Sequence, residues 1–510
     1  MSATAPIASA TAPAALRTDH LGTGLRARAV RGGTLTVGVQ LVRTVIDVAA
    51  GVVLARLLTP SDYGLVAMVL PMTGLIALFK DLGFSAATIQ KDDITPAQVS
   101  LVFWINVAVA ILLAGCCVAL SPLVGRFYGD PRTTWIMMAL AGTFVLGGLA
   151  TQHQALLTRQ MKFGALAAID LATTLARAVI GIAAAWRGCG YWSLVAMTAG
   201  GLLVNTMALW AVEAWRPDRP RSAPGMRAIL RFGSCLTGSR FCLFLGGNAD
   251  KLLIGKLLGP APLGLYTRGF QLLLLPVEQI YTPASSVMLA ALSRLAGQPA
   301  RFRQAARELG ELVLLTIIPV TAILLVLARE TVLVLLGPAW VEAVPVFRGL
   351  AMAAIALPVN YLCGILLQAS GRTDALMRWS FATMTISVLS IVAGLHGGIE
   401  GVAYSWSAGV LFLRTPGFYL TVSRHTAVTF ADLLRPVLTY ALPFLLLVGI
   451  GLALRQLLPF EQPLWTLLVH GVLLAAVYVL YLLARGRHHW LREVLGTLRP
   501  APAPEPSAHA

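Results

Sequence analysis

Long uninterrupted apolar runs leave this chain few ways to fold. They recur from about Thr34 to about residue 484, and most approach the roughly 20 residues that a helix needs to cross the apolar core of a bilayer. Of the 510 residues, 57% are hydrophobic and only 12% are charged, which is too few charges for the surface of a soluble protein of this size. The runs also lack the alternation, about ten residues long, of outer-membrane barrel strands. The sequence therefore predicts an all-α integral membrane protein.

A short motif occurs twice in the chain. Residues 55–65 read ARLLTPSDYGL and residues 255–265 read GKLLGPAPLGL, and a basic residue, Leu-Leu, Pro and Gly-Leu match at six of eleven positions. In each copy an apolar run ends, a Pro suited to the first turn of a helix follows, and a second run begins, so we expect two tight helix-to-helix corners. Six predicted spans separate the copies, and an even number returns the chain to the same face of a membrane. This arrangement predicts two parallel repeats, which is typical of transporters.

The runs predict about fourteen transmembrane helices, arranged as two parallel six-helix lobes followed by a C-terminal helix pair. The predicted parts are a disordered cytosolic tail at 1–33, an N-lobe at 34–215 (helices 1–6), a cytoplasmic linker at 216–229, a C-lobe at 230–425 (helices 7–12), helices 13–14 at 430–485 and a cytosolic tail at 486–510. Basic residues are roughly three times as frequent on the side that this layout makes cytoplasmic, so both termini are expected there. The net charge of +17 therefore reflects topology rather than nucleic-acid binding.

Motifs for catalysis and for cofactor binding are missing from the sequence. It contains no P-loop, no HExxH and no CxxC pair, and its six cysteines lie in or beside apolar runs, as small buried hydrophobic residues do. We therefore expect no enzyme activity, no cofactor and no metal. Without an ATP-binding motif, any uphill transport would draw on an ion, potential or substrate gradient.

Ionisable side chains within the predicted spans are the candidate functional residues. Each costs at least about 2.5 kcal/mol in a bilayer unless it faces a partner or a water-filled cavity. The first span carries Arg43 and Asp47, whose i, i+4 spacing would let them pair on one helix face. A cavity-facing cation tuned by a carboxylate and a self-satisfied structural pair both fit this spacing. Asp170 and Arg177 on the fifth span are weaker candidates.

The second repeat carries matching charges. Subtracting two hundred places Arg240 within one turn of Arg43 on the equivalent helix. A guanidinium suits a phosphate or carboxylate, because it donates hydrogen bonds in a planar fork and stays charged when partly buried. The other charges of this region are Asp250, Lys251, Arg268 and Glu278.

The stretch ARLLTPSDYGLVAMVLPMTGLIALFKDLGFSAATIQKDD at 55–93 resembles the N-terminal region of the polysaccharide-transporter family, the Wzx-type oligosaccharide-lipid flippases, and within it the WzxC-like exporters. The resemblance extends over most of the chain, including FYGDPR at 127–132 and NADKLLIGKLLGPAPLGLYTRGFQLLLLP at 248–276. The two copies of the motif differ where the second has Ala261 and Pro262 in place of Ser61 and Asp62, so any polar role of that loop is not repeated. The family belongs to the multidrug/oligosaccharidyl-lipid/polysaccharide exporter superfamily, which implies fourteen helices in two lobes plus a terminal pair.

The resemblance implies a flippase of the bacterial inner membrane. Its substrate would be an undecaprenyl-pyrophosphate-linked oligosaccharide, such as a lipopolysaccharide, exopolysaccharide or capsule repeat unit, moved to the periplasmic leaflet by alternating access. Its implied partners are that substrate, membrane lipids, and a polysaccharide polymerase with its chain-length machinery, without nucleic acid. The predicted cations for the pyrophosphate are Arg43, Arg240, Arg268 and Lys251, and the candidates for ion coupling are Asp47, Asp250 and Glu278.

Three other functions remain open at this point. A lipid II flippase would share the cationic cavity and differ in the sugar that it accommodates. A cation-coupled drug antiporter of the same superfamily would share the topology, but its cavity should favour carboxylates. A membrane glycan polymerase or ligase would be expected to carry a long outer loop, which the layout lacks.

Overall fold

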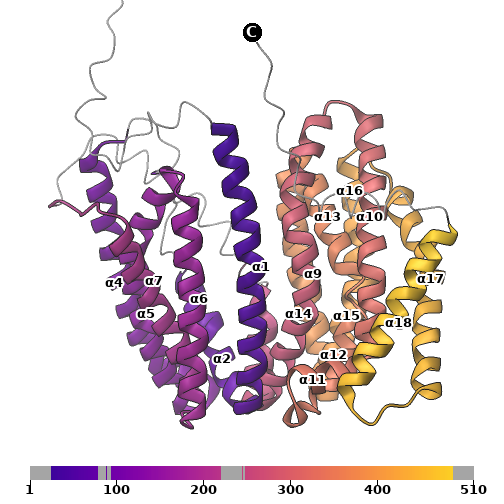
Figure 1. Cartoon of the computed structure of the whole chain (residues 1–510), viewed down its shortest axis with the longest axis horizontal. Helices are drawn as coiled ribbons and strands as arrows, with labels where there is room; N and C mark the ends of the chain where they lie inside the picture. The colour runs from indigo at the N-terminus through magenta and orange to yellow at the C-terminus, as the bar shows by residue number, and fades with distance from the viewer. Residues whose placement is uncertain (1–24, 78–87, 89–93, 220–243, 245–246, 486–510) are drawn as a thin grey trace, which may run out of the picture. The chain divides into compact units, whose positions relative to one another are not determined.

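The computed structural model describes residues 25–77, 88, 94–219, 244 and 247–485, and throughout these residues the regular structure is helical, without a strand (Figure 1). Arg240, both predicted tails beyond these limits and most of the predicted linker lie outside the described residues. The described residues form two compact units. Unit 1 draws on Met1–Leu272, Leu335–Leu350 and Thr373–Gly417, and unit 2 on Leu273–Val334, Ala351–Arg372 and Phe418–Ala510. The assignment of the chain to two repeat lobes stays a prediction.

Between residues 25 and 219 the structure describes six helices of unit 1. They are α1 (Leu25–Leu57), α2 (Pro60–Ala77), α4 (Pro96–Tyr128), α5 (Pro131–Arg159), α6 (Phe163–Trp186) and α7 (Trp192–Val212). Proline opens α2, α4 and α5, where its missing N–H would have no partner within the helix. Helix α1 packs beside α6, and α4 with α5 and α6 with α7 form close pairs. Residues 25–33, predicted as part of the tail, form the first turns of α1.

The remaining helices follow a helix at 247–258. They are α9 (Pro260–Leu295), α10 (Pro299–Val326), α11 (Ala328–Leu335), α12 (Ala343–Ala351), α13 (Ala356–Ala369), α14 (Thr373–Gly394), α15 (Gly398–Ala408), α16 (Thr415–His425), α17 (Phe430–Leu457) and α18 (Pro463–Ala484). Short 3-10 turns lie at Pro338–Trp340 and Leu395–Gly397, and a π-helix at Gly409–Arg414 joins α15 to α16.

Both copies of the motif form the predicted corner, but with different capping. In the first copy the Asp62 carboxylate accepts hydrogen bonds from the backbone N–H of Thr59 at 2.9 Å and from its hydroxyl at 2.7 Å. In return the backbone N–H of Asp62 donates to the Thr59 hydroxyl at 3.3 Å, and this reciprocal capping satisfies a donor that the start of α2 would otherwise leave open. In the second copy Gly259 turns the chain with φ of +91°, a conformation that glycine adopts without a steric cost. The corner is duplicated, whereas its polar cap is not.

Nine helical stretches among the described residues are long and apolar enough to cross a membrane, or ten if α12 and α13, bent by 45°, make one span. One of the nine, Thr373–His425, is 53 residues long and folds back on itself. A Cβ atom at Gly409 would lie 2.1 Å from the hydroxyl of Ser390, and one at Gly417 would lie 2.4 Å from the Trp379 ring, so α14 runs antiparallel to the segment that follows. The total of fourteen spans stays a prediction.

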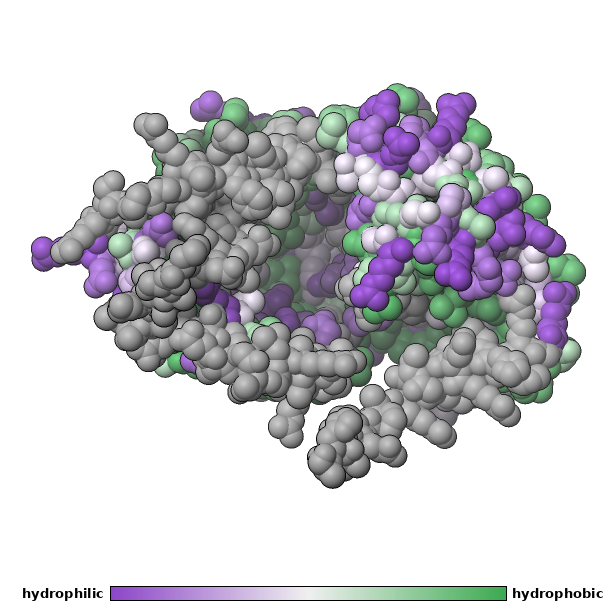
Figure 2. All heavy atoms as spheres, turned by 90° about the horizontal axis from the view of Figure 1, so that it is seen from above, coloured by the Kyte–Doolittle hydropathy of each residue, from purple (hydrophilic) through white to green (hydrophobic). Residues whose placement is uncertain are grey.

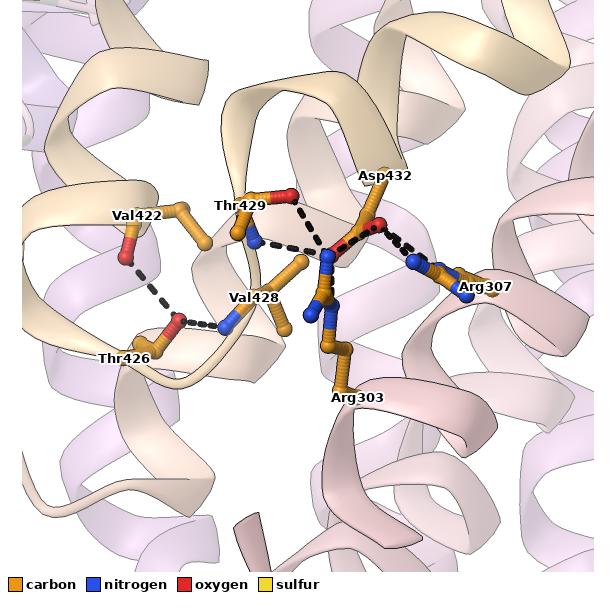
Figure 3. Close-up of polar contacts among 7 residues, drawn as sticks. All are labelled: Arg303, Arg307, Val422, Thr426, Val428, Thr429 and Asp432. Atoms are coloured by element: carbon orange, nitrogen blue, oxygen red, sulfur yellow. Dashed lines mark hydrogen bonds and ion pairs between the residues drawn. The ribbon is translucent and has the colours of Figure 1, made fainter. Parts of the chain in front are cut away.

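In unit 2, α17 is attached to α10 by a charged cluster (Figure 3). The buried carboxylate of Asp432 accepts hydrogen bonds from Arg307 Nε at 2.7 Å and from Arg303 Nη2 at 3.1 Å, and a further one from Arg303 Nε. It also accepts the backbone N–H of Thr429 at 2.9 Å, which caps α17. This cluster lies near the start of α10, and the view from above in Figure 2 shows many hydrophilic residues on the described surface.

Candidate functional site

The clearest polar site within a predicted span joins α1 to α6 in unit 1. Arg43 on α1 makes an ion pair of 2.9 Å with Asp170 on α6, and its Nε donates to the Thr174 hydroxyl at 3.2 Å. Thr174 follows Asp170 by one helical turn, so both side chains lie on the same face of α6. Helix α6 thus presents a carboxylate and a hydroxyl to a single guanidinium.

The Arg43–Asp170 pair is accessible and lies inside the span. The side chains of Arg43 and Asp170 are 29% and 46% exposed. Seven residues of α6 precede Asp170, which places the pair about 10 Å along the helix at 1.5 Å per residue. The two described contacts use two of the five N–H donors of Arg43, so donors remain for an anionic ligand.

In the structure Arg43 pairs with a carboxylate on another helix and not with the one predicted on α1. Among the described residues, the carboxylate bound to Arg43 is that of Asp170, and Asp47 is exposed on α1. The i, i+4 spacing allows a pair within α1, but the rotation of α1 against α6 brings the other carboxylate into bonding distance. The sequence makes Asp170 only a weaker candidate, because nothing local links residues 127 positions apart.

The cations of the second repeat occupy other settings. The guanidinium of Arg268 on α9 lies 3.7 Å from the centre of the Tyr63 ring on α2 and donates to Gln271 at 2.8 Å. Stacking over a ring face is a favourable cation–π geometry. Lys251 donates to the side chain of Asn248, one turn earlier on its own helix, at 2.9 Å. Both cations are half-buried.

Among the described residues, the hydrogen bonds of the predicted cations go to residues outside the predicted site. Arg43 bonds to Asp170 and Thr174, Lys251 to Asn248 and Arg268 to Gln271, whereas Arg240 is outside the described residues. Asp250 is half-buried beside Lys251, whereas Glu278 is exposed on the part of α9 in unit 2. The described residues also contain no cluster of three or more His, Cys, Asp or Glu side chains placed to bind a metal. The four-cation site and the ion-coupling roles stay predictions.

Tyr63 is the site residue that sequence reasoning missed. It is buried, 6% exposed, and forms the platform for Arg268. The available signal was its position in the motif, where the second copy has Leu263 instead. An aromatic residue present in one copy of a repeat and absent from the other indicates a contact that the two repeats do not share.

Comparisons with known proteins agree with this fold. A family model described as "Polysaccharide biosynthesis protein" matches residues 53–345. The teichuronic acid biosynthesis protein TuaB of Bacillus subtilis (strain 168) is 25% identical over 420 residues, which cover 80% of this chain and 86% of TuaB. The lipopolysaccharide biosynthesis protein WzxC of Escherichia coli (strain K12) is 23% identical over 408 residues, covering 78% of this chain and 80% of WzxC.

The fold itself is that of a solved flippase. The structure of the lipid II flippase MurJ in an inward closed conformation superimposes with a TM-score of 0.69 at 12% identity, over 88% of this chain and 98% of MurJ. At this identity the likeness concerns the fold alone. The family match, in contrast, spans more than half of the chain. The chain therefore belongs to the polysaccharide biosynthesis protein family, that of the polysaccharide-transporter flippases.

Proposed function

We propose that the protein is a flippase that moves an undecaprenyl-pyrophosphate-linked oligosaccharide from the cytoplasmic to the periplasmic leaflet of the inner membrane by alternating access. The observation that carries this proposal is the accessible Arg43–Asp170 pair within a span. Membership of the flippase family and the relatives named for teichuronic acid and lipopolysaccharide biosynthesis support it.

The chemistry of the pair suits a pyrophosphate head group. Ionisable side chains in a span almost always face water or one another, because contact with acyl chains is costly, so the exposed side of Arg43 would line an aqueous path. Asp170 and Thr174 hold the guanidinium in place and leave its remaining donors for phosphate oxygens. Asp170 would also keep the resting cation from binding the anion too tightly to release it.

The other predicted residues have defined roles in this proposal. Arg268, Lys251 and Arg240 would pass the pyrophosphate onward while the polyprenyl tail stays in lipid, and both chain termini would lie in the cytoplasm. Ion coupling would use Asp47, Asp250 or Glu278. Transport by the reconstituted protein that ignores both proton and sodium gradients would exclude this coupling. The flipped product would then pass to a polysaccharide polymerase.

The test is transport of a lipid-linked oligosaccharide by purified protein in liposomes. Arg43→Ala should lower the initial rate by about 10-fold to 100-fold, since a hydrogen bond to a charged group is worth about 1.5–3 kcal/mol. Arg43→Lys should retain part of the rate, because it keeps the charge but loses the planar fork. Arg378→Ala is the matched control, since Arg378 pairs with Asp374 in an exposed surface contact.

Each outcome has a clear meaning. Wild-type rates for Arg43→Ala would remove Arg43 from the transport path. Equal transport of undecaprenyl-linked sugars with and without the pyrophosphate would refute the anion-binding role. Preferred transport of lipid II, or of a cationic drug, would replace the proposed substrate with that of another branch of the superfamily.

A further inference from the structure

The two copies of the duplicated motif lie against each other in unit 1. A Cβ atom at Gly64 would lie 1.7 Å from the carbonyl oxygen of Pro260, and a Cβ atom at Gly264 would lie 1.8 Å from the carbonyl oxygen of Pro60. The start of α2 and the start of α9 therefore cross in direct backbone contact, and each copy supplies the glycine that the other copy's proline requires. Only glycine at both positions permits this approach.

Two hydrogen bonds, exchanged between the repeats, reinforce this crossing. Lys256, the basic residue of the second copy, donates to the carbonyl oxygen of Phe127 in the last turn of α4, and its ammonium lies 5.2 Å from the Phe127 ring centre. In return, the buried indole of Trp340, in the turn after α11, donates to the carbonyl oxygen of Ala55 at 2.8 Å. The end of α4 and the turn after α11 thus each bind the end of the helix that precedes the opposite copy of the motif.

The predicted cation Arg268 lies next to this crossing. Tyr63 packs edge-on against Trp340 with ring centres 5.4 Å apart, and its face carries the Arg268 guanidinium. Arg268 follows Gly264 by four residues, about 6 Å along α9. A movement that separates α2 from α9 would therefore also take Arg268 off Tyr63.

We propose that this clasp, defined as the Gly64–Pro260 and Gly264–Pro60 contacts with the two exchanged hydrogen bonds, is the periplasmic gate of the transporter, closed in this structure. The proposal rests on the proposed flippase function. A crossing of bare backbone leaves no gap for a sugar, and few contacts must break to open it. When it opens, the Arg268 guanidinium loses its contact with the Tyr63 ring, so a pyrophosphate can bind it in exchange.

The experiment measures access to α9 just inside the clasp. In a cysteine-free background, Thr267→Cys places a thiol at a half-buried position beside Arg268. We expect a membrane-impermeant maleimide added to the periplasmic side of cells to label it about tenfold faster when Gly64→Ala or Gly264→Ala is added, because the new methyl group cannot fit in the closed clasp. Gly51→Ala is the matched control, since a Cβ atom there meets open space on α1.

A second variant covers the case in which the glycine variants do not fold. Trp340→Phe keeps a ring but removes the donor to Ala55, and we expect a smaller acceleration in the same direction. Equal labelling rates in all variants would overturn the gate, as would acceleration only from the cytoplasmic side. If the labelling follows our expectation but the wild-type protein moves no lipid-linked oligosaccharide, the gate stands and the proposed substrate falls. Normal transport with unchanged labelling would leave the proposed function and remove the gate.

Discussion

Replacing Asp432 with Ala should destabilise unit 2. Asp432 is 3% exposed, whereas its partners Arg303 and Arg307 are 40% and 45% exposed. The substitution removes the cap on α17, worth about 1 kcal/mol, and hydrogen bonds to two charged groups, each worth about 1.5–3 kcal/mol when buried. Both guanidinium groups can return to water, so the second contribution is much reduced, and we expect a total loss of about 2–3 kcal/mol.

The assay compares the melting temperatures of variants in one detergent. For a unit of this size, 2–3 kcal/mol corresponds to a fall in Tm of about 5–10 °C. Asp374→Ala is the control, because Asp374 pairs with Arg378 in an i, i+4 contact with both side chains more than 60% exposed, and such pairs contribute at most about 0.5 kcal/mol. A Tm for Asp432→Ala within one or two degrees of the control would refute the view that the carboxylate anchors α17 to α10.

Two further predictions concern turns. Hydrogen bonds from Arg132 hold the pKa of Asp130 below its usual range, so the stability that this pair adds is complete at neutral pH and is lost progressively as pH falls below about 4; Arg132→Gln should flatten the dependence of Tm on pH between about 5 and 2. Gly398 has φ of +66° and ψ of −153°, so Gly398→Ala should cost about 1–3 kcal/mol. Gly397→Ala, at φ of −95° and with open space for a Cβ atom, should leave the measured unfolding temperature nearly unchanged.

The helices themselves could be predicted from the sequence because the bilayer leaves no alternative. In lipid every backbone N–H and C=O group must bond within its own segment, so an apolar run of about 20 residues is almost obliged to be helical. The predicted fifth span, 163–186, coincides with α6, and Pro60 and Pro260 begin α2 and α9 as expected. Helix α1 extends nine residues further toward the N-terminus than the predicted span, and most of this segment, LRARAVRGG, consists of leucine, alanine and arginine, which favour a helix.

The partners of the charged residues could not be predicted, because they depend on how whole helices rotate and pack. The i, i+4 rule describes one helix and suggested Asp47 for Arg43, whereas packing of α1 on α6 supplied Asp170. The sequence by itself determined that a Pro and a Gly recur two hundred residues apart. Only the tertiary structure decided that the two copies face each other. The requirement for glycine at positions 64 and 264 arises because the backbones at the starts of α2 and α9 are in contact, and that contact depends on how the two helices pack.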